Sequence, residues 1–293
     1  MHESISCRDG THRKRCSPYK GGVICNYIWR GAEVIDGYIR NGKAERDIMN
    51  MYLAESGGAM KAYITEGLYS DANVLQSFYY ASDFTTNVII PNCKSFMLDS
   101  GAFSFMKGKS IANWDAYIDK YADFIVQNGI KLYFELDIDS IVGLDAVINI
   151  RKRLYEKTGV KPIPVWHKAR GLESFKKDCS EYPYVAIGGI VTQEIKRQEY
   201  PIFEKLINIA HASGAKIHGL GFTNLDGLTK YHFDSVDSTA WVSGNRFGAI
   251  YFFDGKTMKK VNKPQGKKVK TNLTAIHNFT EWKKFARYAE AKL

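Results

Sequence analysis

Hydrophobic and polar positions alternate in a regular way along residues 60–293. Short runs rich in β-branched and aromatic residues are each followed by a longer amphipathic segment, which is the pattern of parallel βα units. The strands expected from it are 61–67, 95–103, 131–139, 161–167, 184–191, 216–222 and 232–238, and the clearest helices are 113–128, 143–158 and 194–213. Seven such strands predict an α/β fold of the (β/α)8 TIM-type barrel class with one strand less obvious. A doubly wound open sheet is the alternative, because periodicity does not show whether a sheet closes.

Residues 1–59 have a different character. They hold three of the five cysteines, Cys7, Cys16 and Cys25, together with a basic cluster and little strand pattern, and 44–56 is compatible with a short helix. We therefore expect an N-terminal extension over 1–59 and a compact domain over 60–293. A second interpretation is that Met60 is the true start of the protein.

Most of the expected strands end in polar residues or glycines. In a barrel the carboxyl ends of all strands meet at one rim, where active sites of this fold lie. A single aspartate there is explained as a helix cap, but four carboxylates on one rim are not. The residues at these ends are Asp99, Ser100, Asp137, Asp139, Trp166, His167, Gly188, Gly189, Gly219, Gly221 and Asp234.

The chain changes again after Trp241. Residues 249–261 predict a hairpin with its turn at Asp254 and Gly255, and 279–291 predicts a final helix. Between them, 259–270 contains six lysines and no acidic residue. Such a run is usually a solvated segment, but it also suits a phosphate backbone. The lysines are Lys259, Lys260, Lys263, Lys267, Lys268 and Lys270.

Charge and cysteine content add to this interpretation. The formal net charge is +10, which favours polyanionic partners such as nucleic acid. Five cysteines, an odd number in a large chain, favour free thiols and a reducing compartment. No apolar run reaches the length of a membrane span, and the basic N-terminus is not followed by the apolar run of a secretory signal. We expect a cytoplasmic protein without membrane contact.

Four motifs carry a family resemblance. The stretches LDSGAFS (98–104), AIGGIV (186–191), HGLGFTNLDGL (218–228) and FDSVDST (233–239) resemble, in order and interval, those of the tRNA-guanine transglycosylase superfamily. The small size and the DSGAFS form are most similar to phage DNA 7-deazaguanine transglycosylases, which implies a phage-infected bacterial host. The cysteine cluster that binds zinc in the tRNA enzymes has no counterpart, since no cysteine follows Cys179. The resemblance therefore implies a barrel without the zinc-binding subdomain and without a metal or other cofactor, and it favours DNA over tRNA.

The resemblance implies exchange of guanine for a free 7-deazaguanine base through a covalent aspartyl-glycosyl intermediate. Asp234 aligns with the family nucleophile, with Asp237 as the competing residue, and Asp99 aligns with the general acid/base. Asp137, or alternatively Asp139, aligns with the aspartate that recognises the base. The remaining expected contacts to the base are Ser100, His167, Gly188, Gly189 and Ile190; His167 is nearly as well explained as a core histidine.

Three other functions stay open at this point. One is base exchange in tRNA, an alternative whose family enzymes often form homodimers. A second is a nucleic-acid-binding barrel without catalysis, which the presence of both Asp234 and Asp99 disfavours. The third is an unrelated barrel hydrolase acting on a sugar. The sequence identifies neither the 7-deazaguanine used nor the nucleotide context of the target.

Overall fold

The computed structural model describes residues 15–19, 22–26, 49–55, 66–102, 104, 113–242, 247–263, 265–266 and 270–293. The chain divides into two compact units, Met1–Arg46 and Asp47–Leu293. In the first unit, β1 (Arg15–Tyr19) and β2 (Gly22–Asn26) pair antiparallel, with Cys16 opposite Cys25.

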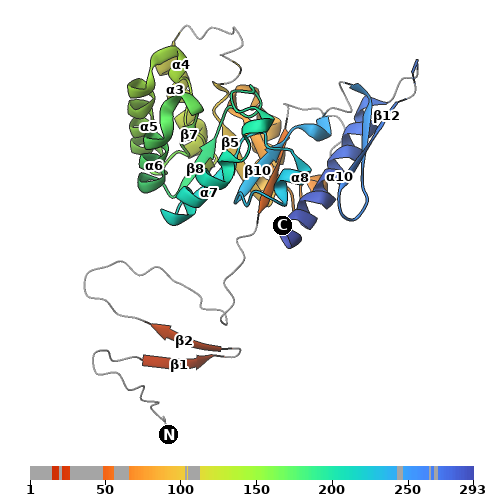
Figure 1. Ribbon diagram of the computed structural model, residues 1–293, viewed down its shortest axis with the longest axis horizontal. Helices are drawn as coiled ribbons and strands as arrows, with labels where there is room; N and C mark the ends of the chain where they lie inside the picture. The colour runs from red at the N-terminus through yellow and green to blue at the C-terminus, as the bar shows by residue number, and fades with distance from the viewer. Residues whose placement is uncertain are drawn as a thin grey trace. The chain divides into compact units, whose positions relative to one another are not determined.

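An eight-stranded parallel sheet forms the centre of the second unit (Figure 1). The spatial order of the strands is β6-β5-β4-β3-β10-β9-β8-β7, so the first strand of the sheet pairs with the last. On both sides of this pair the strands follow one another in chain order. Their bounds are β3 Asn50–Glu55, β4 Asn73–Ser77, β5 Ser95–Asp99, β6 Leu132–Tyr133, β7 Val165–Trp166, β8 Tyr184–Ile187, β9 Lys216–Gly219 and β10 Ser235–Ser238.

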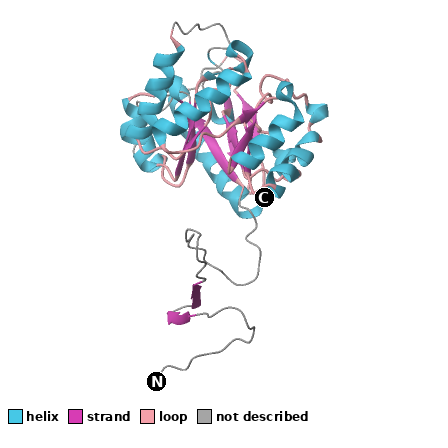
Figure 2. Cartoon of the chain, turned by 90° about the vertical axis from the view of Figure 1, so that its left-hand side faces the viewer, coloured by secondary structure: helices cyan, strands magenta, loops and turns pink. Residues whose placement is uncertain are grey.

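Helices surround the sheet, as Figure 2 shows. Short helical turns also follow several strands: η1 Glu66–Leu68, η2 Phe78–Tyr80, η3 Thr85–Ile89, η4 Lys168–Arg170, η5 Arg197–Glu199 and η6 Ala240–Val242. The α-helices are α1 Ile90–Asn92, α3 Trp114–Gln127, α4 Asp139–Val142, α5 Leu144–Thr158, α6 Gly171–Glu181, α7 Ile202–Ala212, α8 Leu225–Leu228 and α10 Thr271–Lys292. The second unit is thus an α/β fold with a curled, all-parallel sheet flanked by helices.

The two faces of the sheet have different neighbours. Outward side chains such as Met51, Leu98 and Val185 pack with residues of the surrounding helices. The inward side chains form a separate buried cluster that contains no helix residue among its buried members: Tyr52, Ala54, Leu75, Met97, Phe134, Ile163, Val165 and Ala186. Alternation along each strand explains the separation, because successive side chains point to opposite faces.

The segments at the two ends of the strand order also contact each other. Phe134, which follows β6, forms a parallel bridge with Ile163, which precedes β7. The Ile163 amide donates to the Tyr133 carbonyl at 2.8 Å, and the Glu135 amide donates to the Ile163 carbonyl at 3.0 Å. Main-chain hydrogen bonds therefore connect the β6 side of the sheet to the β7 side.

The start of the second unit differs from the sequence-based expectation. The helix expected over 44–56 is wrong at Asn50–Glu55, which is the strand β3 between β4 and β10, while 44–48 and 56 lie outside the described residues. Its residues favour helices in isolation, but Met51 and Leu53 are buried on one face and Tyr52 on the other, and burial overrides that local propensity. The compact unit therefore begins before β3, at Asp47, within the range expected to be an extension.

Two further strands were misassigned. The missing strand is β4, whose buried Asn73 and Gln76 interrupt its hydrophobic pattern. Of the strand expected at 61–67, residues 61–65 lie outside the described residues, and Glu66 and Gly67 belong to the helical turn η1.

The C-terminal hairpin is confirmed. Strands β11 (Ala249–Phe253) and β12 (Met258–Asn262) pair antiparallel around the turn at Asp254. The edge of β11 is covered by α10, since Asn278 and Glu281 accept hydrogen bonds from the amides of Tyr251 and Phe253. In Figure 1, α10 lies beside this hairpin. No helix in the described ranges is both long and apolar enough to cross a membrane.

Candidate active site

Asp99 is the last residue of β5 and holds a protonatable carboxyl at the carboxyl end of the sheet. Its Oδ2 accepts a hydrogen bond from the Gly101 amide at 3.0 Å. Gly101 has φ +84°, and a side chain there would collide with Tyr79; glycine therefore allows the chain to fold back on Asp99.

The pKa of Asp99 is raised from 3.8 to about 7. Burial is the largest cause, and the nearby negative charges of Asp137 and Asp237 add to it, while the Gly101 amide and the Ser77 side chain lower the pKa. A carboxyl with a pKa near neutrality both donates and accepts a proton efficiently at physiological pH. Asp99 therefore has the properties of a general acid/base.

Asp137 lies beyond β6 and belongs to a chain of three side chains. His167 Nε2 lies 3.0 Å from Asp137 Oδ2, and His167 Nδ1 lies 3.0 Å from Glu194 Oε2. Burial lowers the pKa of His167, but the hydrogen bonds and charge of its two carboxylate partners outweigh this effect and raise the pKa to about 9. Burial also raises the pKa of Asp137 above its usual range, although His167 lowers it. The group presents a carboxylate fixed by a cationic imidazole.

Gly188 and Gly189 make room for this group. A Cβ at Gly188 would lie 2.7 Å from the His167 ring, and one at Gly189 would lie 2.7 Å from the Glu194 carboxylate. The Gly188 amide donates to the Trp166 carbonyl in the sheet, so this N–H is engaged within the protein. The two glycines thus accommodate His167 and Glu194, whereas the sequence led us to expect backbone contacts to a base.

Ser100 and Ile190, the other two residues expected to contact the base, are both buried. The Ser100 carbonyl accepts the Tyr117 hydroxyl at 2.6 Å, and the Ser100 hydroxyl accepts the Ala102 amide at 3.4 Å. The Ile190 carbonyl accepts the Gln193 amide at 3.3 Å. Both residues shape the turns that follow β5 and β8.

Asp139 has a different hydrogen-bond partner from Asp137. It is the first residue of α4 and accepts a hydrogen bond from Arg170, which also donates to the buried Glu135. Burial raises the pKa of Asp139, but Arg170 outweighs burial and holds the pKa below its usual range. Arg151 donates to Glu135 and to Asp178 in the same network. Through this network Asp139 is ion-paired with Arg170, which links the segment after β6 to Glu135, α5 and α6.

Asp234 and Asp237 lie at opposite ends of β10. Asp234 precedes the strand, and its Oδ2 accepts the Ile217 amide at 2.7 Å and His211 Nε2 at 3.0 Å. Asp237 is near the carboxyl end, and its Oδ1 accepts the Gly221 amide at 2.6 Å and His218 Nε2 at 3.3 Å. The charge of Asp237 raises the pKa of Asp99.

The structure therefore brings Asp99, Asp137 and Asp237 together and leaves Asp234 apart. The different placement of the two aspartates has a simple cause: two residues three positions apart on a strand point to opposite faces. Asp237 shares a face with Ser235, whose hydroxyl meets the inward His218. This spacing rule was available from the sequence and distinguishes the two aspartates. Sequence reasoning also missed Glu194, which lies outside the four motifs, and His218, which begins the motif at 218–228 but was given no role.

Four of the six predicted basic residues are among the described residues and lie on or near the hairpin. Lys259 and Lys260 are exposed on β12, Lys263 follows that strand, and exposed Lys270 precedes α10. Lys259 lies 3.5 Å from Asp254. Lys267 and Lys268 lie outside the described residues.

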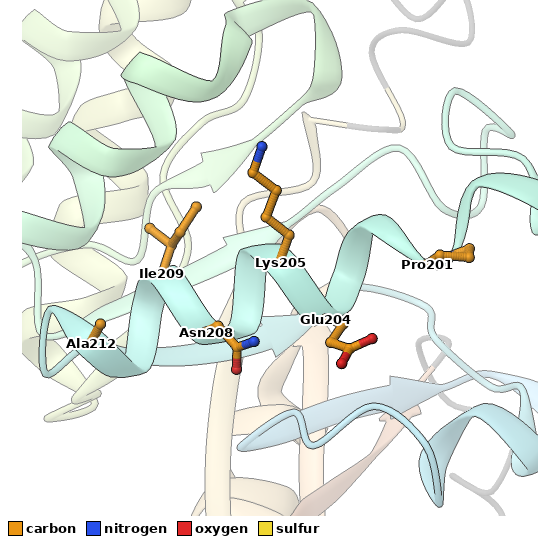
Figure 3. Close-up of a pocket in the computed structure, with 6 residues that line it drawn as sticks. All are labelled: Pro201, Glu204, Lys205, Asn208, Ile209 and Ala212. Carbon is orange, nitrogen blue, oxygen red and sulfur yellow. The ribbon is translucent and has the colours of Figure 1, made fainter.

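A surface hollow on α7 offers no comparable chemistry. Its lining residues are Pro201, Glu204, Lys205, Asn208, Ile209 and Ala212, which belong to this one helix and the residue before it (Figure 3). None of them belongs to the carboxylate group at the strand ends. Within the part of the chain that the structure describes, no cluster of three or more His, Cys, Asp or Glu side chains is arranged to hold a metal ion.

Comparisons with known proteins complete the description of the site. No protein-family model matches this chain, and no curated protein matches it significantly.

Proposed function

We propose that this protein is a guanine transglycosylase that exchanges guanine in DNA for a 7-deazaguanine base through a covalent aspartyl-glycosyl intermediate. The observation that carries the proposal is that two carboxyl groups with different properties lie at the carboxyl ends of the strands. The pKa of Asp99 is raised to about 7, and the negative charge of Asp237 contributes to this shift, which supports an acid/base role for Asp99 beside a nucleophilic Asp237. The four motifs that resemble the transglycosylase superfamily support the same chemistry.

The proposal includes closure of the sheet into a (β/α)8 barrel between β6 and β7. The bridge between Phe134 and Ile163 supports closure, as does the inward cluster without buried helix residues. The pairing of the first strand with the last gives the strand order of such a barrel. In a closed barrel, Asp99, Asp137 and Asp237 share the catalytic rim.

Asp237 is the proposed nucleophile in place of Asp234. The Gly221 amide and His218 Nε2 both donate to Oδ1, and Oδ2 accepts no hydrogen bond from the described residues. Oδ2 is therefore available to attack C1′ of the target nucleotide, as in retaining glycosidases.

The reaction proceeds by two displacements. In the first, Asp237 Oδ2 bonds to C1′, the bond from C1′ to guanine N9 breaks with its electron pair on guanine, and protonated Asp99 gives its proton to the departing base. In the second, the carboxylate of Asp99 takes the N9 proton of the incoming 7-deazaguanine. N9 of the incoming base then bonds to C1′ and displaces Asp237. Two inversions retain the sugar configuration, and the backbone stays intact.

Asp137 is the proposed group that recognises the base. Its carboxylate accepts from the guanine N1–H and 2-amino groups, and His167 and Glu194 fix its orientation. A target base in duplex DNA has to leave the stack to reach this rim.

The net charge of +10 and the exposed lysines of β12 support a nucleic-acid partner. DNA is the proposed substrate and tRNA the alternative, and a homodimer is part of the tRNA alternative. The lysines provide a separate test: Lys259→Ala with Lys260→Ala reduces the slope of log affinity against log salt by about 2 if both contact phosphates.

An exchange assay tests the function. The protein is incubated with duplex DNA, single-stranded DNA or tRNA carrying labelled guanine, together with a 7-deazaguanine base. We expect release of labelled guanine from DNA beyond one equivalent per enzyme to require the deazaguanine and to match its incorporation. Release from tRNA alone would favour the tRNA alternative, and no release from any of the three would contradict the transglycosylase proposal.

A further inference from the structure

A buried hydrogen-bonded chain runs from Asp237 through the inward face of the sheet. His218 on β9 is fully buried, and its Nε2 lies 3.3 Å from Asp237 Oδ1. Its Nδ1 lies 2.5 Å from Ser235 Oγ, which lies 2.5 Å from the Tyr184 hydroxyl. The chain thus connects the carboxyl end of β10 with Tyr184, the first residue of β8.

The chemistry of these groups assigns a direction to the hydrogen bonds. A carboxylate only accepts, so His218 Nε2 donates to Asp237. An imidazole with its single proton on Nε2 then accepts at Nδ1, which the Ser235 hydroxyl satisfies. Ser235 has one proton, so its oxygen accepts from the Tyr184 hydroxyl. Every donor then has an acceptor, and Tyr184 and Ser235 fix the tautomer of His218.

We propose that His218 is a positioning residue that holds the nucleophile Asp237 with Oδ2 toward the sugar and stabilises its carboxylate when it leaves. This inference rests on the proposed function. His218 contacts neither sugar nor base and acts through Asp237 alone.

The two displacements use this contact differently. When Oδ2 bonds to C1′, Asp237 becomes an ester and Oδ1 its carbonyl oxygen. When N9 of the incoming base displaces Asp237, the electron pair of the C1′–Oδ2 bond returns to the carboxylate. The His218 Nε2–H and the Gly221 amide then donate to a growing negative charge, which is where hydrogen-bond donors assist most. The Nε2 proton stays on His218 throughout.

The surroundings of His218 show that packing alone does not explain a polar ring there. The ring centroid lies 5.3 Å from that of Phe134 and 6.2 Å from that of Tyr52. An aromatic residue without nitrogen suits such neighbours without the cost of burying polar atoms. The two nitrogens are accounted for by Asp237 and Ser235.

The inference is tested with His218→Phe and His218→Gln. Phe keeps the ring volume and removes the donor, whereas the Gln side-chain amide replaces the donor and is the rescue variant. Thermal unfolding and the dissociation constant for 7-deazaguanine are measured for each, because a purely structural defect alters both. Guanine exchange and the fraction of covalent glycosyl-enzyme after denaturing quench are measured with the DNA substrate.

For His218→Phe we expect kcat about tenfold to a hundredfold lower, the effect of losing one hydrogen bond to a charged group. Base affinity stays unchanged, the covalent intermediate accumulates, and His218→Gln recovers part of the rate. Unchanged exchange by His218→Phe would overturn the inference and leave the proposed function intact. A loss without accumulation, parallel to loss of base affinity, would also overturn it. No exchange by the wild type would overturn both.

The tautomer gives a second readout that does not depend on activity. Nitrogen-15 NMR of the histidine side chains in the wild type distinguishes the two neutral tautomers and the cation. We expect His218, assigned with the His218→Gln variant or by its contacts to Phe134, to carry its proton on Nε2. A proton on Nδ1 alone would overturn the inference.

Discussion

The two ends of β10 carry aspartates with nearly the same local bonding but different surroundings. Asp234 and Asp237 each accept a main-chain amide and a histidine on one carboxylate oxygen. Asp237 raises the pKa of Asp99, whereas Asp234 ties β10 to the start of β9 and to α7. Hydrogen bonds to the carboxylates therefore do not distinguish the two aspartates; the acidic neighbours at the carboxyl ends of the strands do.

The sharpest test of this difference is Asp237→Asn. The amide is a poor nucleophile, so guanine exchange is expected to fall by on the order of a thousandfold or more. Release of labelled guanine from DNA measures it, and Asp234→Asn is the matched control at the other end of the strand. Equal activity of Asp237→Asn and wild type would contradict the assignment.

Asp99→Asn tests the role proposed for Asp99 through exchange activity and through the pH dependence of stability. Exchange falls about a hundredfold or more because the acid/base is lost. Since the folded pKa of about 7 lies above the ordinary 3.8, folding binds a proton between these values, and wild-type stability falls as pH rises from about 4 to 7.

An asparagine cannot ionise, so the variant does not lose the stability that the wild type loses as Asp99 ionises. Asp99→Asn therefore raises the free energy of unfolding at pH 8 by up to about 4 kcal/mol, with no gain below pH 4. Denaturant unfolding at the two pH values measures the effect. The same change in stability at both would show that the carboxyl is not perturbed.

Asp234→Ala tests the structural end. It leaves the buried Ile217 amide without its acceptor, and the free energy of unfolding falls by about 1–3 kcal/mol. Exchange activity per folded molecule is retained. Asp234→Asn keeps an acceptor and loses less stability in the same urea titration. If a folded Asp234→Asn protein had no exchange activity, Asp234 rather than Asp237 would be the nucleophile.

His211→Ala has the smallest expected effect. His211 is about one-third exposed and donates to Asp234, so its loss costs about 0.5–1 kcal/mol of stability and leaves exchange unchanged. Compared with His218→Phe, it separates a histidine that supports the fold from one that supports the reaction. Thermal unfolding and the exchange assay on both variants provide the comparison.

Much of the fold was predictable because strand and helix periodicities are strong between residues 95 and 238. The exceptions were β3 and β4. Local propensity favours a helix at the first, and the polar Asn73 and Gln76 obscure the second. Both are strands because the sheet buries them, which is a tertiary effect that periodicity does not capture. Of the expected strand at 61–67, the described residues are helical.

The site was predictable in part. Polar strand ends were expected to converge, which predicted that Asp99 and Asp137 lie close together. His167 was expected in the same place, but its partner Glu194 was not. Asp234 was chosen over Asp237 by motif alignment, although the alternation of a strand separates them. The distant contacts of Asp139 with Arg170 and of His218 with Ser235 depend on the folded sheet and are not visible in any local pattern.

The most direct test of the account is to identify the residue that carries the sugar. The protein is incubated with guanine-containing DNA, quenched in denaturant and digested with nuclease and protease, and the modified peptide is located by mass spectrometry. The account predicts a deoxyribose ester on Asp237. A sugar on Asp234, or no covalent adduct from a preparation that releases guanine, would contradict it.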